Sequence, residues 1–81
     1  NAIQLDGGFH IEEAIEELGL GLPDGDYETV AGFILSRLGR IPRQGEQLKY
    51  RNLKFAIAEM RGMKIEKVMV TREKEGAAPA S

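Results

Sequence analysis

The sequence has no cysteine among its 81 residues. This excludes disulfides, thiolate metal sites and cysteine nucleophiles, and it fits a reducing compartment. Long hydrophobic runs are also missing: the longest is VAGFIL at 30–35, whereas a membrane-spanning helix needs about 20 apolar residues. No charged segment followed by an apolar segment opens the chain, so we expect no signal peptide. What remains is the composition of one small globular domain, with 42% hydrophobic and 30% charged residues.

Residue types that carry catalysis are scarce as well. The only histidine is His10, and the only serines are Ser36 and Ser81. A nucleophile, a base within reach and a group that orients the base cannot be assembled from these residues, so we expect no catalytic residues and no enzyme activity. Asp6, His10 and Glu13 surround one turn and could be imagined as a metal site. A lone histidine beside acids is more typical of an exposed surface, so no metal is expected there.

Acidic and basic residues occupy different halves of the chain. Residues 1–36 hold eight acids and no Lys or Arg, whereas residues 37–81 hold all eleven bases and five acids. Such segregation indicates either a directional partner or charges that face each other within the fold, and we favour the second interpretation. Nucleic-acid binding is disfavoured, because the net charge is −2 and the bases are not interleaved with stacking aromatic residues.

Apolar residues recur at helical spacing over residues 11–18, and Gly19 is expected to end this helix. The opposite face carries Glu12, Glu13, Glu16 and Glu17, which we interpret as a solvated face rather than a cation site, because such carboxylates do not converge on one ion. The following GLGLPDG at 19–25 resembles the dinucleotide motif GxGxxG. Its third glycine falls one place late and it follows a helix instead of a strand, so we interpret it as a linker.

A second helix is expected from Asp26, as N-cap, to Gly39, with Pro42 just beyond. One face is broadly apolar. The other carries small residues with a phenylalanine beside them: Thr29, Gly32, Phe33 and Ser36. A helical glycine costs about 1 kcal/mol against alanine, so Gly32 indicates that another backbone approaches closely. These four residues are the candidate partner interface.

The period then changes from helical to alternating, which predicts strands around residues 48–50, 53–57 and 65–70, with turns at 51–52 and 61–62. Ile65, Val68 and Val70 can all point inward only if Glu66-Lys67 contains a bulge. With a short first strand at 2–5, the fold class is α+β, in the order β-α-α-β-β-β. We assign residues 3–71 to one domain and residues 72–81 to a disordered tail, and we expect residues 1–2 to be an expression-tag scar on a fragment of a larger protein.

Residues 27–46, YETVAGFILSRLGRIPRQGE, closely resemble the signature of the CorC/HlyC transporter-associated domain. The resemblance extends over about residues 2–71. The matching positions within the signature are Tyr27, Glu28, Thr29, Ala31, Gly32, Leu38, Gly39, Ile41, Pro42, Gly45 and Glu46.

This resemblance implies a non-catalytic accessory domain at the C-terminus of a bacterial CBS-domain protein, often behind an integral-membrane domain. Such proteins include some linked to magnesium and cobalt efflux and others labelled hemolysins. The implied partners are the parent's own CBS pair and membrane domains, or a second copy in a homodimer. The implied location is the cytoplasmic side of the bacterial inner membrane, with no insertion by this domain itself. The family supplies no agreed catalytic residues.

The family's fold is similar to a lobe of a FAD-binding architecture, so a FAD or adenine-nucleotide binder is the alternative function. Its phosphates would face the basic half of the chain, at Arg37, Arg40, Arg43, Lys49 and Arg51. No glycine-rich loop at a helix N-terminus supports this alternative. We therefore expect no cofactor to co-purify.

Overall fold

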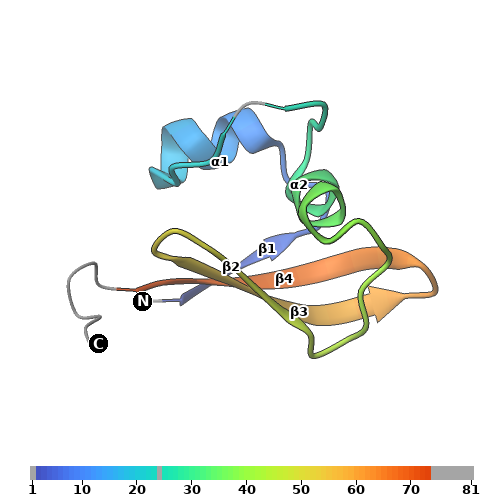
Figure 1. Ribbon diagram of the computed structural model, residues 1–81. Coiled ribbons are helices and arrows are strands. Elements are labelled where there is room, and N and C mark those ends of the chain that lie inside the picture. Colours follow the sequence, from blue (N-terminus) through green and yellow to red (C-terminus); the bar gives the residue numbers. More distant parts are fainter. Residues whose placement is uncertain (1, 24, 74–81) are drawn as a thin grey trace.

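The computed structural model describes residues 2–23 and 25–73, which form two helices on one face of an antiparallel sheet (Figure 1). In chain order the elements are β1 (Ala2–Asp6), α1 (Ile11–Leu18), α2 (Val30–Leu38), β2 (Gln47–Tyr50), β3 (Leu53–Arg61) and β4 (Lys64–Arg72). The strands lie in the order β1-β4-β3-β2, and each neighbouring pair is antiparallel. The predicted α+β class and element order are confirmed, and the first strand joins the sheet beside the last one.

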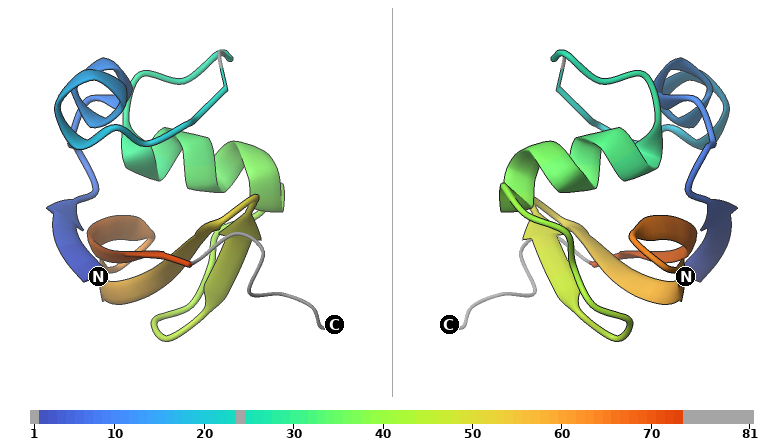
Figure 2. Two further views of the ribbon diagram at one scale, coloured as in Figure 1. Left: turned by 90° about the vertical axis from the view of Figure 1, so that its left-hand side faces the viewer. Right: turned by 90° about the vertical axis from the view of Figure 1, so that its right-hand side faces the viewer.

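The core lies between the helices and the sheet, with α2 directly over the strands and α1 to one side (Figure 2). The buried side chains of the described residues are all apolar. Most of them come from alternate residues in the first half of β3, from three residues of β4 and from one stripe of each helix. The buried residues are Leu5, Ile11, Ala14, Leu20, Leu22, Val30, Phe33, Ile34, Leu53, Phe55, Ile57, Ile65, Val68 and Val70. Within the described residues, the helices have eight and nine residues, and no helix is long and apolar enough to cross a bilayer.

The predicted bulge in β4 is confirmed. Ile65, Val68 and Val70 are all buried, although Val68 lies three positions after Ile65. The ladder passes from Ile57↔Val68 through Glu59↔Lys67 to Met60↔Ile65. Glu66 on β4 and Ala58 on β3 therefore have no partner in the ladder. Because each strand carries one extra residue, the register is restored and the apolar side chains stay on the core face. The hairpin turn is Gly62-Met63, one residue later than predicted, because β3 continues to Arg61.

Gly7 joins the sheet to α2 through its backbone. Its N–H donates to the Glu66 carbonyl at 2.8 Å, and its own carbonyl accepts from the Ala31 N–H at 2.9 Å. A Cβ atom at Gly7 would lie 2.0 Å from the Ile65 carbonyl oxygen. The position therefore requires glycine for the close approach of two backbones, and not only for the turn after β1.

The ends of both helices are confirmed, but the predicted start of α2 is wrong. Gly19 and Gly39 adopt the left-handed conformation, with φ of 69° and 73°. The N-cap of α2 is Thr29 instead of Asp26: its backbone is extended, and its Oγ1 accepts from the Gly32 N–H at 3.1 Å. A threonine at this place satisfies an N–H of the first turn that has no partner within the helix.

The ordered sheet extends beyond the predicted domain limits. Ala2 pairs with Thr71, and Arg72 pairs with Leu53, so the expectation of a disordered tail from residue 72 is wrong for Arg72. The Glu73 N–H also donates to the Asn52 carbonyl, at 2.7 Å. Residues 1 and 74–81 lie outside the described residues, and the tag origin of residues 1–2 stays a prediction.

Candidate functional site

The predicted partner interface on α2 is not one exposed surface, and its assignment of Phe33 is wrong. Phe33 is fully buried, with its ring centroid 5.3 Å from that of Tyr27, 5.6 Å from Tyr50 and 5.5 Å from Phe55. Val30, Phe33 and Ile34 form the inward stripe of a helix that begins after Thr29. Starting the helix at Asp26 placed Tyr27 on the apolar face and displaced Phe33 from it.

Two small residues of the predicted interface, Thr29 and Gly32, lie at the start of α2. Thr29 caps α2, and a Cβ atom at Gly32 would lie 3.1 Å from the Tyr27 Cβ and 3.4 Å from the Thr29 Oγ1. The backbone that approaches Gly32 is therefore the chain's own preceding segment. Of the four predicted interface residues, Ser36 alone is exposed.

The five basic candidates do not converge on one point. Arg40 and Arg43 belong to the loop after α2, where both bind Glu46: Arg40 through its guanidinium, and Arg43 through its backbone N–H at 2.9 Å. The Arg40 hydrogen bond, followed by that from Arg43, lowers the pKa of the Glu46 carboxyl to about 2. The same contact raises the pKa of Arg40. The charge of Arg40 is thus compensated within the loop, whereas the Arg43 guanidinium forms no ion pair among the described residues.

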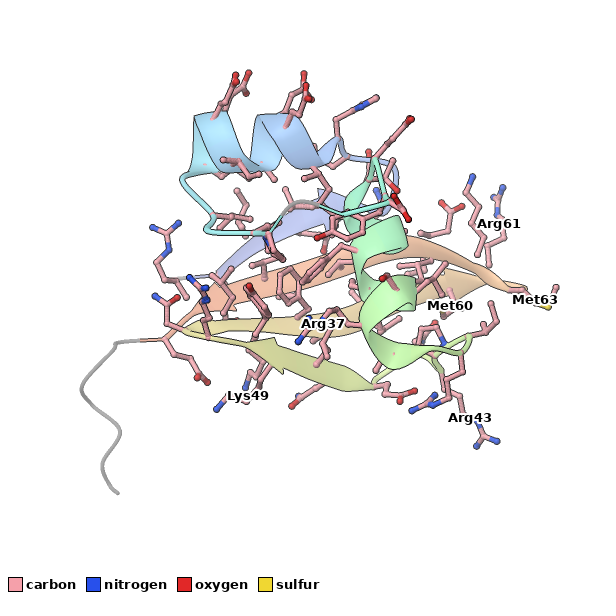
Figure 3. The ribbon with its side chains drawn as sticks, turned by 45° about the horizontal axis from the view of Figure 1, so that its top comes forward. Arg37, Arg43, Lys49, Met60, Arg61 and Met63 are labelled. Atoms are coloured by element: carbon pink, nitrogen blue, oxygen red, sulfur yellow. The ribbon has the colours of Figure 1, made fainter. Side chains whose placement is uncertain are left out.

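The other three bases are Lys49 on β2, Arg51 directly after it and Arg37 near the end of α2. Figure 3 shows Arg37 and Lys49 well separated from Arg43. Lys49 pairs with Glu73 at 3.2 Å. The guanidinium carbons of Arg37 and Arg51 lie 5.0 and 5.5 Å from the centroid of the Tyr50 ring. Within the described part of the chain, neither Arg37 nor Arg51 forms an ion pair. These two arginines and Tyr50 form an exposed cationic and aromatic group, which we call the Arg–Tyr–Arg group.

The opposing charges of the two halves come together as an ion pair at one place in the described residues. In residues 2–23 and 25–73 the ion pairs are Arg40–Glu46, Lys49–Glu73, Lys64–Glu66 and Lys67–Asp6. Only Lys67–Asp6, at 2.8 Å, joins the acidic half to the basic half. The interpretation that the charges of the two halves face each other is therefore supported by one direct ion pair among the described residues.

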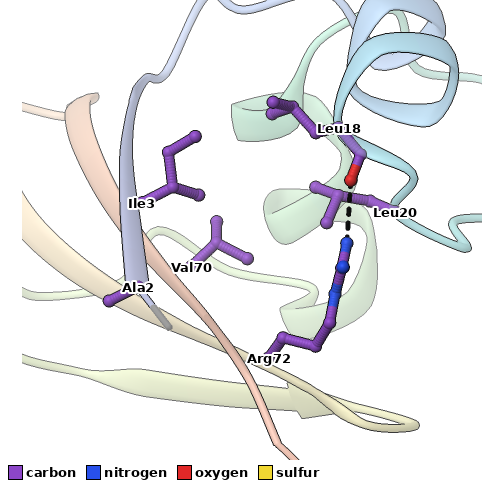
Figure 4. Close-up of a pocket in the computed structure, with 6 residues that line it drawn as sticks. All are labelled: Ala2, Ile3, Leu18, Leu20, Val70 and Arg72. Atoms are coloured by element: carbon purple, nitrogen blue, oxygen red, sulfur yellow. Dashed lines mark hydrogen bonds between the residues drawn. The ribbon is translucent and has the colours of Figure 1, made fainter.

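A small apolar pocket of about 180 Å³ lies between the C-terminal end of α1 and the β1–β4 edge (Figure 4). It is lined by Ala2, Ile3, Leu18, Leu20, Val70 and Arg72. The Arg72 guanidinium donates to the Leu18 carbonyl at 2.8 Å and so satisfies an acceptor at the end of the helix. This contact fixes α1 to the sheet, and it leaves the pocket with a hydrocarbon lining.

A larger cleft of about 480 Å³ lies between α1 and the segment before α2, and we call it the acidic cleft. It is lined by His10, Ile11, Glu12, Ile15, Pro23, Gly25, Tyr27 and Glu28. Backbone hydrogen bonds hold its two walls together: the Ile11 N–H donates to the Glu28 carbonyl at 2.8 Å, and the Val30 N–H donates to Phe9 at 2.9 Å. The cleft could not be predicted from the sequence, because the linker separates its two walls along the chain.

The alternative metal site is not assembled. The described residues bring no three His, Asp or Glu side chains together in a way that could hold a metal ion. Asp6 instead accepts from the Lys67 ammonium, which raises the pKa of Lys67.

The fold and these surfaces define a small α+β domain with charged, ligand-accessible faces. The family model described as the CorC_HlyC transporter associated domain matches residues 1–74, and the chain belongs to this family. The resemblance found in residues 27–46 is thereby confirmed.

Relatives of the chain include part of an export protein and a domain of a hemolysin. The chain is 31% identical over 74 residues to the polyamine export protein of Escherichia coli K12. The aligned region covers 89% of this chain and 17% of that protein. A CorC_HlyC domain from a Xylella fastidiosa hemolysin, solved in complex with Mg²⁺ and Mn²⁺, is 33% identical, with a TM-score of 0.79 over 90% of this chain and 89% of that one. A CorC_HlyC domain from Nitrosomonas europaea is 34% identical, with a TM-score of 0.80 over 89% and 87%.

Proposed function

We propose that this chain is a non-catalytic accessory domain of a bacterial CBS-domain exporter of cations, lying on the cytoplasmic side of the inner membrane. The observation that carries the proposal is the family match over nearly the whole chain, together with the identity to a polyamine export protein. The chain spans 17% of that relative's length, so transport itself would belong to other parts of the parent. The cargo would be a cation, either a polyamine or a divalent metal such as magnesium or cobalt.

The domain would act by docking onto the parent's CBS pair or onto a second copy. The Arg–Tyr–Arg group supports this role, because two arginines that form no ion pair among the described residues flank a partly exposed aromatic ring. Arginine and tyrosine are enriched in interface centres, and a positive surface favours an acidic partner.

The docking role is tested by reversing these charges in the full-length parent. Arg37→Glu combined with Arg51→Glu should reduce site-specific cross-linking between this domain and the rest of the parent, and should change cation efflux. Arg43→Glu is a suitable single control, because Arg43 is also an exposed arginine but lies well separated from Arg37 in Figure 3. Unchanged cross-linking and efflux in the double variant would remove this group as the docking surface.

FAD or adenine-nucleotide binding is the second candidate. It is favoured by the same group, because guanidinium groups bind phosphates and the Tyr50 ring offers a stacking face. Calorimetric titration of the chain with FAD and with ATP tests this candidate. Heat of binding that is lost in Arg37→Ala/Arg51→Ala would support it, and no heat at millimolar ligand would dismiss it.

A further inference from the structure

We propose that the acidic cleft binds an aliphatic polyamine, a flexible hydrocarbon chain with ammonium groups at its ends. This inference rests on the proposed function as part of a cation exporter, and it adds a site at which the domain would sense the cargo. The cleft shares no residue with the Arg–Tyr–Arg group, and its lining comes from the acidic half of the chain.

The shape of the cleft suits a slender ligand. Its volume of about 480 Å³ falls within the range of small-molecule sites. One wall is the first half of α1, and the other is the segment that carries Tyr27 and Glu28. The Tyr27 hydroxyl donates to the Pro23 carbonyl, which holds the ring against this segment. Together with the backbone bonds from Ile11 and Val30, this contact makes a preformed site.

The chemistry of the lining matches both parts of a polyamine. Glu12 and Glu28 lie on opposite walls and can each accept hydrogen bonds from an ammonium group. Ile15 and the Tyr27 ring, both partly exposed, offer apolar surface for the methylene groups, and an aromatic ring face also attracts a cation. A bare divalent metal fits less well, because Mg²⁺ and Ca²⁺ require several convergent oxygen ligands.

Within the described residues, no Lys or Arg competes for these two carboxylates. The residues that line the cleft include no Lys or Arg, and residues 1–36 contain none at all. Neither Glu12 nor Glu28 takes part in an ion pair within the described segments 2–23 and 25–73. The acidic face of α1 adds Glu13, Glu16 and Glu17, whose field raises the local concentration of cations.

The test is an NMR titration of the 81-residue chain with 1,4-diaminobutane and with spermidine, following backbone amides at constant ionic strength. We expect saturable shifts confined to residues 10–15 and 25–28. Glu12→Gln combined with Glu28→Gln should raise the Kd by about tenfold or more. Glu13→Gln combined with Glu17→Gln removes the same charge from α1 outside the cleft, and should change the Kd by less than about twofold.

Three results would overturn the proposal. One is the absence of saturable shifts, and another is an equal loss of affinity in both double variants, which would indicate general attraction to the acidic face. The third is an identical set of shifts with Mg²⁺ alone. All four substitutions are at exposed positions, and the dispersion of each variant's spectrum reports that it remains folded. If no polyamine binds while efflux by the parent still depends on the domain, the cleft assignment fails and the proposed function stands.

Discussion

At the scale of single residues, Gly7 is the position where one added methyl group should do most damage. Gly7→Ala would place a Cβ atom 2.0 Å from the Ile65 carbonyl oxygen, a backbone atom held within the sheet. We expect the free energy of unfolding to fall by more than about 2 kcal/mol. Urea denaturation followed by circular dichroism measures this change. Gly8→Ala is the matched control, because a Cβ at Gly8 meets nothing within 4 Å; equal losses in the two variants would contradict the close approach.

Gly32 gives a graded prediction. In Gly32→Ala, the higher helix propensity of alanine would stabilise the fold by up to about 1 kcal/mol. The added Cβ would lie 3.1 Å from the Tyr27 Cβ, and this close contact opposes the gain. Leucine would extend further into the same segment, so Gly32→Leu should be clearly less stable than Gly32→Ala in thermal unfolding. A leucine variant as stable as the unmodified chain would show that the segment around Tyr27 can move aside at no cost.

At the scale of elements, the loop between α2 and β2 is held by Glu46 and should respond to pH. The pKa of the Glu46 carboxyl falls from the ordinary 4.5 to about 2 in the folded chain, mainly through its hydrogen bond from Arg40. This stabilisation is therefore fully present above about pH 4.5 and is lost as the pH falls toward about 2. Urea midpoints measured between these values should decline less steeply in Glu46→Gln than in the unmodified chain. Because the Arg40–Glu46 pair is exposed, 1 M salt should reduce this difference between the two proteins. Urea midpoints that decline equally with falling pH in both proteins at low salt would contradict this role of Glu46.

The elements also show what the sequence can and cannot reveal. Gly19 and Gly39 end their helices through local backbone geometry, so both ends were predictable. The bulge followed from the demand that Ile65 and Val68 both face the core. The N-cap was missed because Asp26 and Thr29 are both residue types that cap helices well. The folded backbone distinguishes them: Thr29 is extended and its Oγ1 accepts from the Gly32 N–H.

Features that join distant segments were less accessible from the sequence. The acidic cleft depends on backbone bonds between residues 9–11 and 28–30, which no local pattern specifies. The basic candidates were recognised by type, but tertiary structure decided which of them are compensated. Arg40 pairs with Glu46 in the loop after α2, and Lys49 pairs with Glu73 just after β4. Arg37 and Arg51 instead lie over the ring of Tyr50.

At the scale of the whole molecule, the two charged regions suggest a division of roles. The acidic cleft and the outer face of α1 would attract a cationic ligand, while the Arg–Tyr–Arg group would contact an acidic part of the parent. Among the described residues a single ion pair, Lys67–Asp6, joins the two halves, and the acidic cleft shares no residue with the Arg–Tyr–Arg group. A ligand-responsive accessory domain needs two such sites on one rigid fold.

The most direct measurement of this account is cation efflux by the full-length parent with and without residues 2–73. Cells loaded with labelled 1,4-diaminobutane, and separately with Co²⁺, would be compared at equal amounts of parent protein in the membrane fraction. An accessory role predicts that the shortened parent still reaches the membrane but exports at least one of these cations at a changed rate. Export of both at the rate of the intact parent would contradict the account.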